Sequence, residues 1–414
     1  MADPRRDEVG QRSETVRRAN LSAIVRELHV SGPLTRSELV TRTGLTRSAI
    51  RGLIGELVAA DIVSEERSAS LGIPGRPSPV VTPNASSRVV LALDILVDSA
   101  AAALVGLGGQ VLQYVRRDRP RGHFAVDEVI ADLADLAAEI RVRQAMSNDL
   151  VGVGVAVVGM VRRSDGFVSM APNLGWRDVP LGEMLGDALG TRAPIAVANE
   201  ADLGALAELR RGVSASASDI LFISGEVGVG GGLIVGGVPL TGISGYGGEV
   251  GHMPINPVGV DCRCGSRGCW ETEIGEGALL RRAGLSQDGG SAAVDAFFVD
   301  VAAGVPSAVA AMEEEGRWLG FGLAGLVNIF NPRQIVLGGL IGRIYPYVAE
   351  MLELELDRHA LPGPRDLVRI VPASLGVDAP LLGAAELAFE PLLTDPGAWI
   401  GPRGATTELL GASA

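Results

Sequence analysis

Apolar residues near the N-terminus recur with the spacing of amphipathic helices. One helix is predicted by an i, i+3, i+4, i+7 stripe that consists of Leu21, Ile24, Val25 and Leu28. Gly32-Pro33 ends this helix. Thr35 followed by Glu38 predicts a capping box, in which each side chain satisfies an unpaired backbone amide of the other residue. A short second helix is therefore expected up to Thr43, and Gly44 supplies the tight turn after it.

A third helix is predicted to begin near Thr46 and to bury Ile50, Leu53, Ile54, Leu57 and Val58. A short helix, a glycine turn and a second helix form a helix-turn-helix, whose second helix enters the DNA major groove. Arg47, Ser48 and Arg51 lie off the apolar stripe, and arginine can donate two hydrogen bonds to guanine. A solvated helix face is the alternative. The three-helix context favours DNA contact by Thr46, Arg47, Ser48 and Arg51.

The next segment has the pattern of a wing. Ile62-Val63 and Val80-Val81 can pair as a hairpin, and Gly75-Arg76-Pro77 lies between them. An extended Gly-Arg-Pro can place the guanidinium of Arg76 in a narrow minor groove. A simple linker is the alternative for this segment.

Beyond Val89 short apolar runs alternate with helical patterns. The predicted buried strands are Val89–Leu93, Val151–Val158, Ile195–Ala198, Ile220–Ser224 and Ile335–Leu337. The predicted helices are Val129–Arg141, Ala201–Arg211 and Glu314–Ile329. This alternation indicates α/β architecture. Because it occurs twice, around 89–198 and 219–340, we expect two lobes with a cleft between them.

Composition and charge refine this picture. A length of 414 residues suggests two or three domains, and 47% hydrophobic residues allow a large core. The net charge of −13 argues against a surface made for nucleic acid throughout. Residues 1–85 nevertheless carry 12 Arg against 10 Asp and Glu, a balance of +2 that leaves −15 for the remainder. A DNA-binding module on an acidic sensor fits this asymmetry, and chance variation fits it equally well.

No export or membrane signal is expected. The first residues, MADPRRDEVGQR, are charged and have no apolar core. The uncharged stretch Val227–Gly248 contains ten glycines among 22 residues, so strands and turns are predicted there. We therefore expect a cytoplasmic protein.

The three cysteines lie within eight residues, at metal-ligand spacing. His252 is followed after nine residues by Cys262-x-Cys264, and Cys269 comes four residues later. Three thiolates and one imidazole complete a tetrahedral shell and leave no open position, which is typical of structural zinc. The alternative is three buried or redox-active thiols beside an unrelated histidine.

Carboxylates and amides surround this motif in the sequence. They are Asn173, Asn199, Glu200, Glu249 and Glu271. Carboxylates give bidentate hydrogen bonds to neighbouring hydroxyls, so the set favours a sugar pocket, and a metal beside it would hold Glu249 and Glu271 rigidly. Taken singly, each of these residues is more typical of an ordinary surface position.

These residues resemble the ROK family (repressors, open reading frames, kinases) over nearly the whole chain. The motifs that carry the resemblance are APNLGW at 171–176, NEADLGALAE at 199–208, EVGVGGG at 226–232, GGEVGH at 247–252, CRCGSRGCWE at 262–271 and NPRQIVLGG at 331–339. A winged helix-turn-helix ahead of the body resembles the repressor branch. The resemblance implies a two-lobed, actin-like, hexokinase-type (ribonuclease H-like) body, a structural Zn²⁺ and a sugar pocket. The implied pocket residues are Asn173, Asn199, Glu200, Glu249, His252 and Glu271.

The chain departs from the kinase pattern in three places. In ROK kinases the first strand leads into an Asp-x-Gly-Gly-Thr turn that holds ATP phosphates, but this chain has Asp94-Ile-Leu-Val-Asp98. Val227 replaces the threonine of the second phosphate loop, and Glu200 stands where the kinases have their Asp base. The longer side chain displaces that carboxylate by about 1 Å, enough for a loss on the order of 100-fold. Catalysis is therefore expected to be lost, with Glu200 a degenerate base.

The resulting hypothesis is a sugar-responsive transcriptional repressor. It would bind operator DNA as a homodimer or homotetramer and respond to a sugar or sugar phosphate. The expected divisions are a head at 1–85, lobes at 86–198 and 199–385, and a C-terminal helix and tail at 386–414 that returns to the first lobe. An ATP-dependent sugar kinase with a fused DNA-binding head is the main alternative, and a scaffold that binds neither sugar nor DNA is a third.

Overall fold

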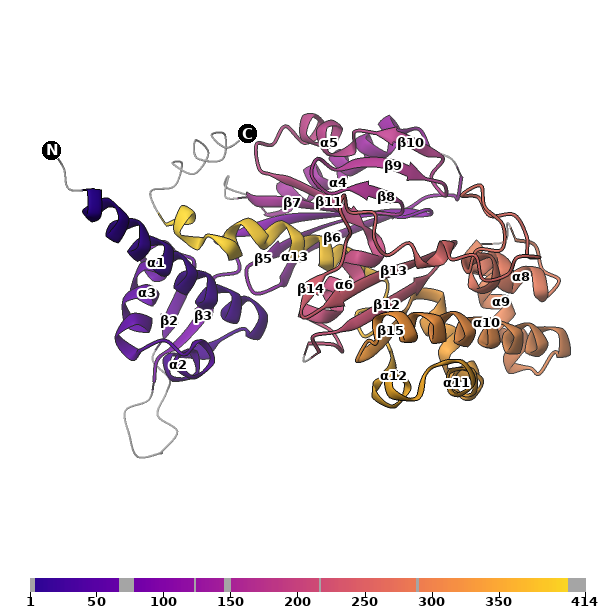
Figure 1. Cartoon of the computed structure of the whole chain (residues 1–414). Coiled ribbons are helices and arrows are strands. Elements are labelled where there is room, and N and C mark those ends of the chain that lie inside the picture. Colours follow the sequence, from indigo (N-terminus) through magenta and orange to yellow (C-terminus); the bar gives the residue numbers. More distant parts are fainter. Residues whose placement is uncertain are drawn as a thin grey trace.

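The computed structural model describes residues 4–66, 78–122, 124–144, 150–215, 217–287 and 290–400. Its N-terminal part, here called the head, contains three helices and a three-stranded antiparallel sheet of order β1-β3-β2 (Figure 1). The elements are α1 (Pro4–Ser31), β1 (Leu34–Thr35), α2 (Arg36–Thr43), α3 (Arg47–Ala59), β2 (Val63–Glu66) and β3 (Val80–Pro83). The predicted wing is confirmed, since Val63 pairs with Pro83 and Glu66 pairs with Val80.

Local sequence signals explain the helix-turn-helix. Glu38 N–H donates to Thr35 Oγ1, and the Glu38 carboxylate accepts from the Thr35 amide, which confirms the capping box. Gly44 has φ 69°, and Thr46 caps α3. The prediction that Val58 is buried was wrong, because Val58 lies at the edge of the apolar stripe in the last turn of α3 and is 40% exposed. The two-residue strand β1, which pairs with β3, was not predicted.

The first lobe is built on a five-stranded sheet of order β11-β7-β4-β5-β6. Strands β4, β7 and β11 run parallel, and β5 and β6 form antiparallel hairpins beyond β4. The sheet strands are β4 (Val89–Ile95), β5 (Ser99–Gly106), β6 (Gln110–Asp118), β7 (Leu150–Val157) and β11 (Ile195–Asn199). Outside the sheet lie α4 (Val126–Gln144), α5 (Leu181–Leu189) and a small sheet of β8 (Met160–Arg162), β9 (Phe167–Ala171) and β10 (Trp176–Val179).

Helix α13 (Ala379–Thr394) packs against β4 and β7 and also contacts α1 of the head, as Figure 1 shows. Its close approach requires glycine in the strand below. A Cβ atom at Gly154 would lie 1.9 Å from the carbonyl oxygen of Ala384, which is far inside van der Waals contact. Because α13 begins at Ala379, the expected division at residue 385 falls inside this helix.

The second lobe is built on a sheet of order β14-β13-β12-β15-β16, with β12, β15 and β16 parallel. Its strands are β12 (Ile220–Gly225), β13 (Val229–Val235), β14 (Val238–Pro239), β15 (Gln334–Gly338) and β16 (Arg369–Pro372). Its helices are α6 (Glu200–Arg210), α7 (Glu271–Ile274), α8 (Glu276–Arg282), α9 (Gly290–Ala302), α10 (Pro306–Phe330), α11 (Gly339–His359) and α12 (Pro362–Leu367). All five buried strands and all three helices predicted in the body are confirmed, and so is the two-lobed α/β fold.

Among the described residues no single helix is long and apolar enough to cross a membrane. Helices α9 and α10 reach the required length and apolar composition only when taken together, and the pair is bent by 104°. The apolar residues Leu319, Leu323 and Val327 of α10 are buried in the core of the second lobe.

Candidate functional site

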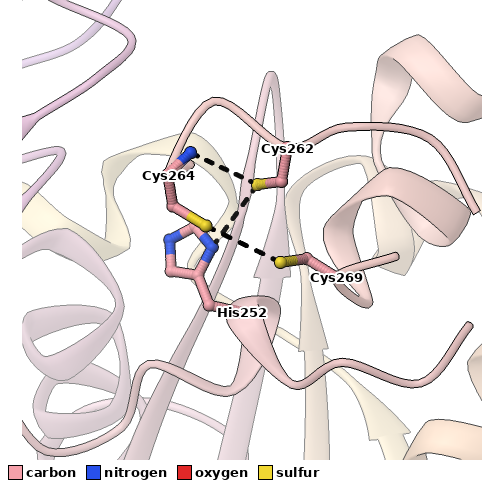
Figure 2. A group of neighbouring side chains, drawn as sticks. All are labelled: His252, Cys262, Cys264 and Cys269. Atoms are coloured by element: carbon pink, nitrogen blue, oxygen red, sulfur yellow. Dashed lines mark hydrogen bonds between the residues drawn. The ribbon is translucent and has the colours of Figure 1, made fainter. Parts of the chain in front are cut away.

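The four predicted metal ligands converge on one point (Figure 2). His252 ends the short helix η1 (Val250–His252), and the three cysteines lie on the loop before α7. All four ligand atoms lie within 4.8 Å of one another. The loop can close because residue 268 is glycine, since a Cβ there would lie 1.6 Å from the carbonyl oxygen of Asn256.

The geometry of this cluster fits a tetrahedral ion. Cys262 Sγ lies 3.7 Å from His252 Nδ1, and Cys264 Sγ lies 3.7 Å from Cys269 Sγ. Zn–S bonds of about 2.3 Å give a tetrahedral edge of about 3.8 Å. Burial raises the pKa of the Cys262 and Cys269 thiols, so a nearby cation is needed to hold them as thiolates. The cluster could therefore hold a metal.

Two predicted sugar ligands flank the metal cluster. Glu271, the first residue of α7, accepts from Cys262 Sγ at 3.0 Å and lies 3.9 Å from His252 Nδ1. Glu249 lies 3.9 Å from His252 Nε2. Burial and the nearby Glu271 raise the pKa of Glu249, and His252 opposes this shift. Both carboxylates thus contact residues of the cluster that could hold a metal.

Asn173 reaches the same place from the first lobe. It lies in the turn after β9, and its Oδ1 accepts from Arg263 Nη1 of the cysteine loop at 2.8 Å. A Cβ atom at Gly228 would lie 2.9 Å from Glu271 Oε2 and 3.2 Å from Asn173 Nδ2. Residue 228 must therefore stay without a side chain for these two polar groups to keep their positions.

Asn199 and Glu200 stand at the start of α6, which packs directly on the glycines of β13. Asn199 Oδ1 accepts from the Ala201 amide at 2.7 Å, and its Nδ2 donates to the Gly159 carbonyl at 2.9 Å, so both ends of this side chain bind the backbone. Burial, with the negative charges of Asp94 and Glu226, raises the pKa of Glu200 to about 8. A carboxyl group with a pKa in this range can donate a hydrogen bond when protonated and accept a proton when ionised.

The turn that departs from the kinase pattern holds an ion cluster instead of glycines. Arg121 Nη1 lies 2.5 Å from Glu276 Oε1 of α8, and its Nε lies 3.4 Å from Asp98 Oδ2. Since Arg121 and Asp98 belong to the first lobe and Glu276 to the second, the cluster joins the lobes. Asp94 is 2% exposed with Oδ1 unpaired among the described residues, and burial raises its pKa to about 7.

The predicted DNA-contacting residues lie together at the start of α3. Arg47, Ser48 and Arg51 are exposed, and neither arginine forms an ion pair with another described residue. Thr46 Oγ1 accepts from the Ala49 amide at 3.2 Å and contacts Ser48 Oγ at 3.0 Å. Arg76 lies outside the described residues. DNA contact by these side chains stays a prediction.

A hollow of about 130 Å³ lies between the lobes beside the metal cluster. Its lining includes Asn173, Glu271 and Cys262, and also Arg263 and Arg281, which the sequence reasoning missed. The position of Arg263 between two cysteine ligands was the available signal. The sequence carries no signal for Arg281, because only the packing of α8 brings this residue to the hollow.

The family model described as "ROK family" matches residues 90–390. The xylose repressor of Bacillus spizizenii is 28% identical over 91% of this chain and 97% of its own length. The glucokinase of Streptomyces coelicolor is 31% identical over 73% of this chain and 98% of its own length. Among solved structures, a ROK family transcriptional regulator homologous to the Escherichia coli Mlc protein has a TM-score of 0.74 and 27% identity, and covers 92% of this chain and 97% of its own. A ROK glucokinase of Streptomyces griseus with glucose and AMPPNP has a TM-score of 0.62 and 27% identity, and covers 72% of this chain and 98% of its own.

Proposed function

Because the chain belongs to the ROK family, we propose that it is a sugar-responsive, DNA-binding transcriptional repressor. The observation that carries this proposal is the share of this chain that each relative matches. The xylose repressor and the regulator structure match more than nine-tenths of the chain, head included, whereas the glucokinases match their whole length with about a quarter of this chain left over.

In the head, α3 would lie in the major groove with Thr46, Arg47, Ser48 and Arg51 near base edges, and Arg76 would reach the minor groove. A homodimer or homotetramer would present two heads to a palindromic operator, since two half-sites require two-fold symmetry. We propose the divisions 1–85, 86–198, 199–385 and 386–414 for the head, the two lobes and the C-terminal segment, with α13 running across the last boundary. We place the protein in the cytoplasm, where free cysteines stay reduced.

In the body, the cysteine–histidine cluster would hold Zn²⁺, which would fix the loop that carries Glu249, His252 and Glu271. Asn173, Asn199 and Glu200 would complete the sugar site. Loss of kinase activity is supported by the ion cluster of Arg121, Asp98 and Glu276. Two carboxylates there are unfavourable for a triphosphate, and the longer side chain of Glu200 would displace its carboxylate from the position of the kinase base.

The test uses the full-length, zinc-loaded protein and an operator selected from random duplex DNA. We expect a retarded complex that a sugar or sugar phosphate releases, and no phosphate transfer in a coupled assay with ATP and the same sugars. Turnover at ordinary kinase rates would establish the rival kinase function. If the protein neither binds DNA nor responds to a sugar, only the scaffold hypothesis remains.

A further inference from the structure

We propose that the effector carries an anionic group, a phosphate or a carboxylate, and that Arg263 and Arg281 bind this group in the hollow next to the sugar residues. The proposal rests on the proposed sugar site and specifies the chemical class of its ligand. It also assigns a function to two arginines that the sequence motifs leave without one.

The hollow adjoins the candidate sugar site, so one ligand can contact both the sugar-site residues and the two arginines. Asn173 and Glu271 belong to the candidate sugar site and also line the hollow, so a ligand held by them extends directly towards Arg263 and Arg281. Arg263 already touches the sugar site, because its Nη1 donates to Asn173 Oδ1 at 2.8 Å. This bond also orients the amide, so that Asn173 Nδ2 is the end that faces Gly228 and Glu271.

Both arginines are free to bind an anion. Arg281 Nη2 donates to the Thr272 carbonyl at 2.9 Å, and neither Arg263 nor Arg281 has an ion pair with another described residue. Their neighbours in sequence behave differently. Arg267 lies 2.8 Å from Asp261, and Arg282 is bound by Glu273 and Glu315 at 2.6 and 2.8 Å. The two unpaired guanidiniums in this region are therefore the two that line the hollow.

The arginine on the other side of the site is less able to bind an anion. At the turn after β4, Arg121 is bound by both Asp98 and Glu276, so its charge is already compensated. An anionic group would therefore bind the guanidiniums of the hollow in preference to Arg121, and this fixes the direction in which a sugar lies. Arginine suits this task because its planar fork matches phosphate and carboxylate geometry.

The test measures binding by calorimetry, with full-length zinc-loaded protein, to matched pairs. The probes are glucose, xylose and mannose, their phosphate monoesters, glucuronate, and inorganic phosphate alone. We expect the anionic member of a pair to bind at least about tenfold more tightly than the neutral sugar, which corresponds to about 1.4 kcal/mol. Arg263→Gln and Arg281→Gln should each remove most of that preference and the weak binding of inorganic phosphate.

Arg317→Gln is the matched control, since it removes an exposed charge of the second lobe that lies outside the hollow. Zinc content is measured in every variant, so that a disturbed loop is recognised. Equal or tighter binding of the neutral sugars, or an anion preference that survives both hollow variants, would overturn the inference and leave the proposed function intact. A protein that binds operator DNA but none of these probes would contradict the sugar site itself, and the inference with it.

Discussion

Arg211 Nη2 lies 2.8 Å from His29 Nε2, although the two residues are 182 positions apart in the chain. Arg211 follows the last turn of α6, the helix that begins at Asn199 and Glu200 in the candidate sugar site. His29 is fully buried in α1 of the head. Glu386 of α13 holds both residues, at 2.7 Å from Arg211 Nε and 3.0 Å from His29 Nε2. Helix α6 thus connects the candidate sugar site to the base of the head.

We therefore expect Arg211→Met to uncouple the two sites. Removing Arg211 leaves Glu386 with His29 as its remaining partner among the described residues and lowers the free energy of unfolding by about 2 kcal/mol. Effector affinity should change little, while release of operator DNA by effector should weaken. Urea unfolding and operator titrations with and without effector measure the two effects. Arg210→Met is the control, because Arg210 reaches Glu390 only at 4.0 Å; an undiminished response in Arg211→Met would rule out coupling through α6.

Stability should fall as the pH rises from 6 to 9. Burial raises the pKa of Asp94 to about 7 and of Glu200 to about 8, well above their ordinary values of 3.8 and 4.5. The folded protein therefore holds protons that the unfolded chain releases. The resulting stabilisation is complete below about pH 4 and is lost as the pH rises through 7 to 8. Thermal unfolding across this range measures it.

In Glu200→Gln, which cannot ionise, the fall in Tm between pH 6 and 9 should be smaller than in the unmodified protein. The control is Glu128→Gln on the exposed part of α4, which should leave the pH profile unchanged. A Glu200→Gln protein whose Tm falls as steeply as that of the parent would show that Glu200 is ionised in the folded state.

Features encoded by neighbouring residues could be predicted from the sequence. The capping box of Thr35 and Glu38 spans three positions, and the metal cluster spans 252–269, so spacing alone was sufficient. Val58 was wrongly placed because the periodicity of a helix does not show what covers its last turn. The ROK resemblance supplied the two-lobed arrangement, which the local pattern only suggested.

Contacts between distant segments could not be predicted in this way. Arg263 meets Asn173 across 90 positions, and Arg121 meets Glu276 across 155. Arginine is common on surfaces, so its sequence position does not show which carboxylate or amide it meets. Packing of the two lobes decides those partners, and it becomes visible only in the structure.

Alanine at Arg47 or Arg51 should weaken specific operator binding by about 1–3 kcal/mol, because each arginine can donate two hydrogen bonds to a guanine. Sugar affinity should not change, since both side chains are exposed in the head. Mobility-shift titrations at fixed salt measure the effect. Arg358→Ala on α11, where Arg358 pairs with Glu355 in the second lobe, is the control. Unchanged operator affinity in both head variants would refute the assignment of α3 as the recognition helix.

Gly228→Ala tests whether the space between Asn173 and Glu271 is where a ligand binds. The added methyl group would lie 2.9 Å from Glu271 Oε2 and 3.2 Å from Asn173 Nδ2, so it occupies the space between these polar groups and displaces one of them. We expect effector affinity to fall at least about tenfold, or about 1.4 kcal/mol, with zinc content and operator binding retained. Gly325→Ala in α10, where a Cβ meets nothing within 4 Å, is the matched control and should stabilise the helix slightly. Calorimetry on both variants measures the difference, and an effector that binds Gly228→Ala as well as the parent must lie elsewhere.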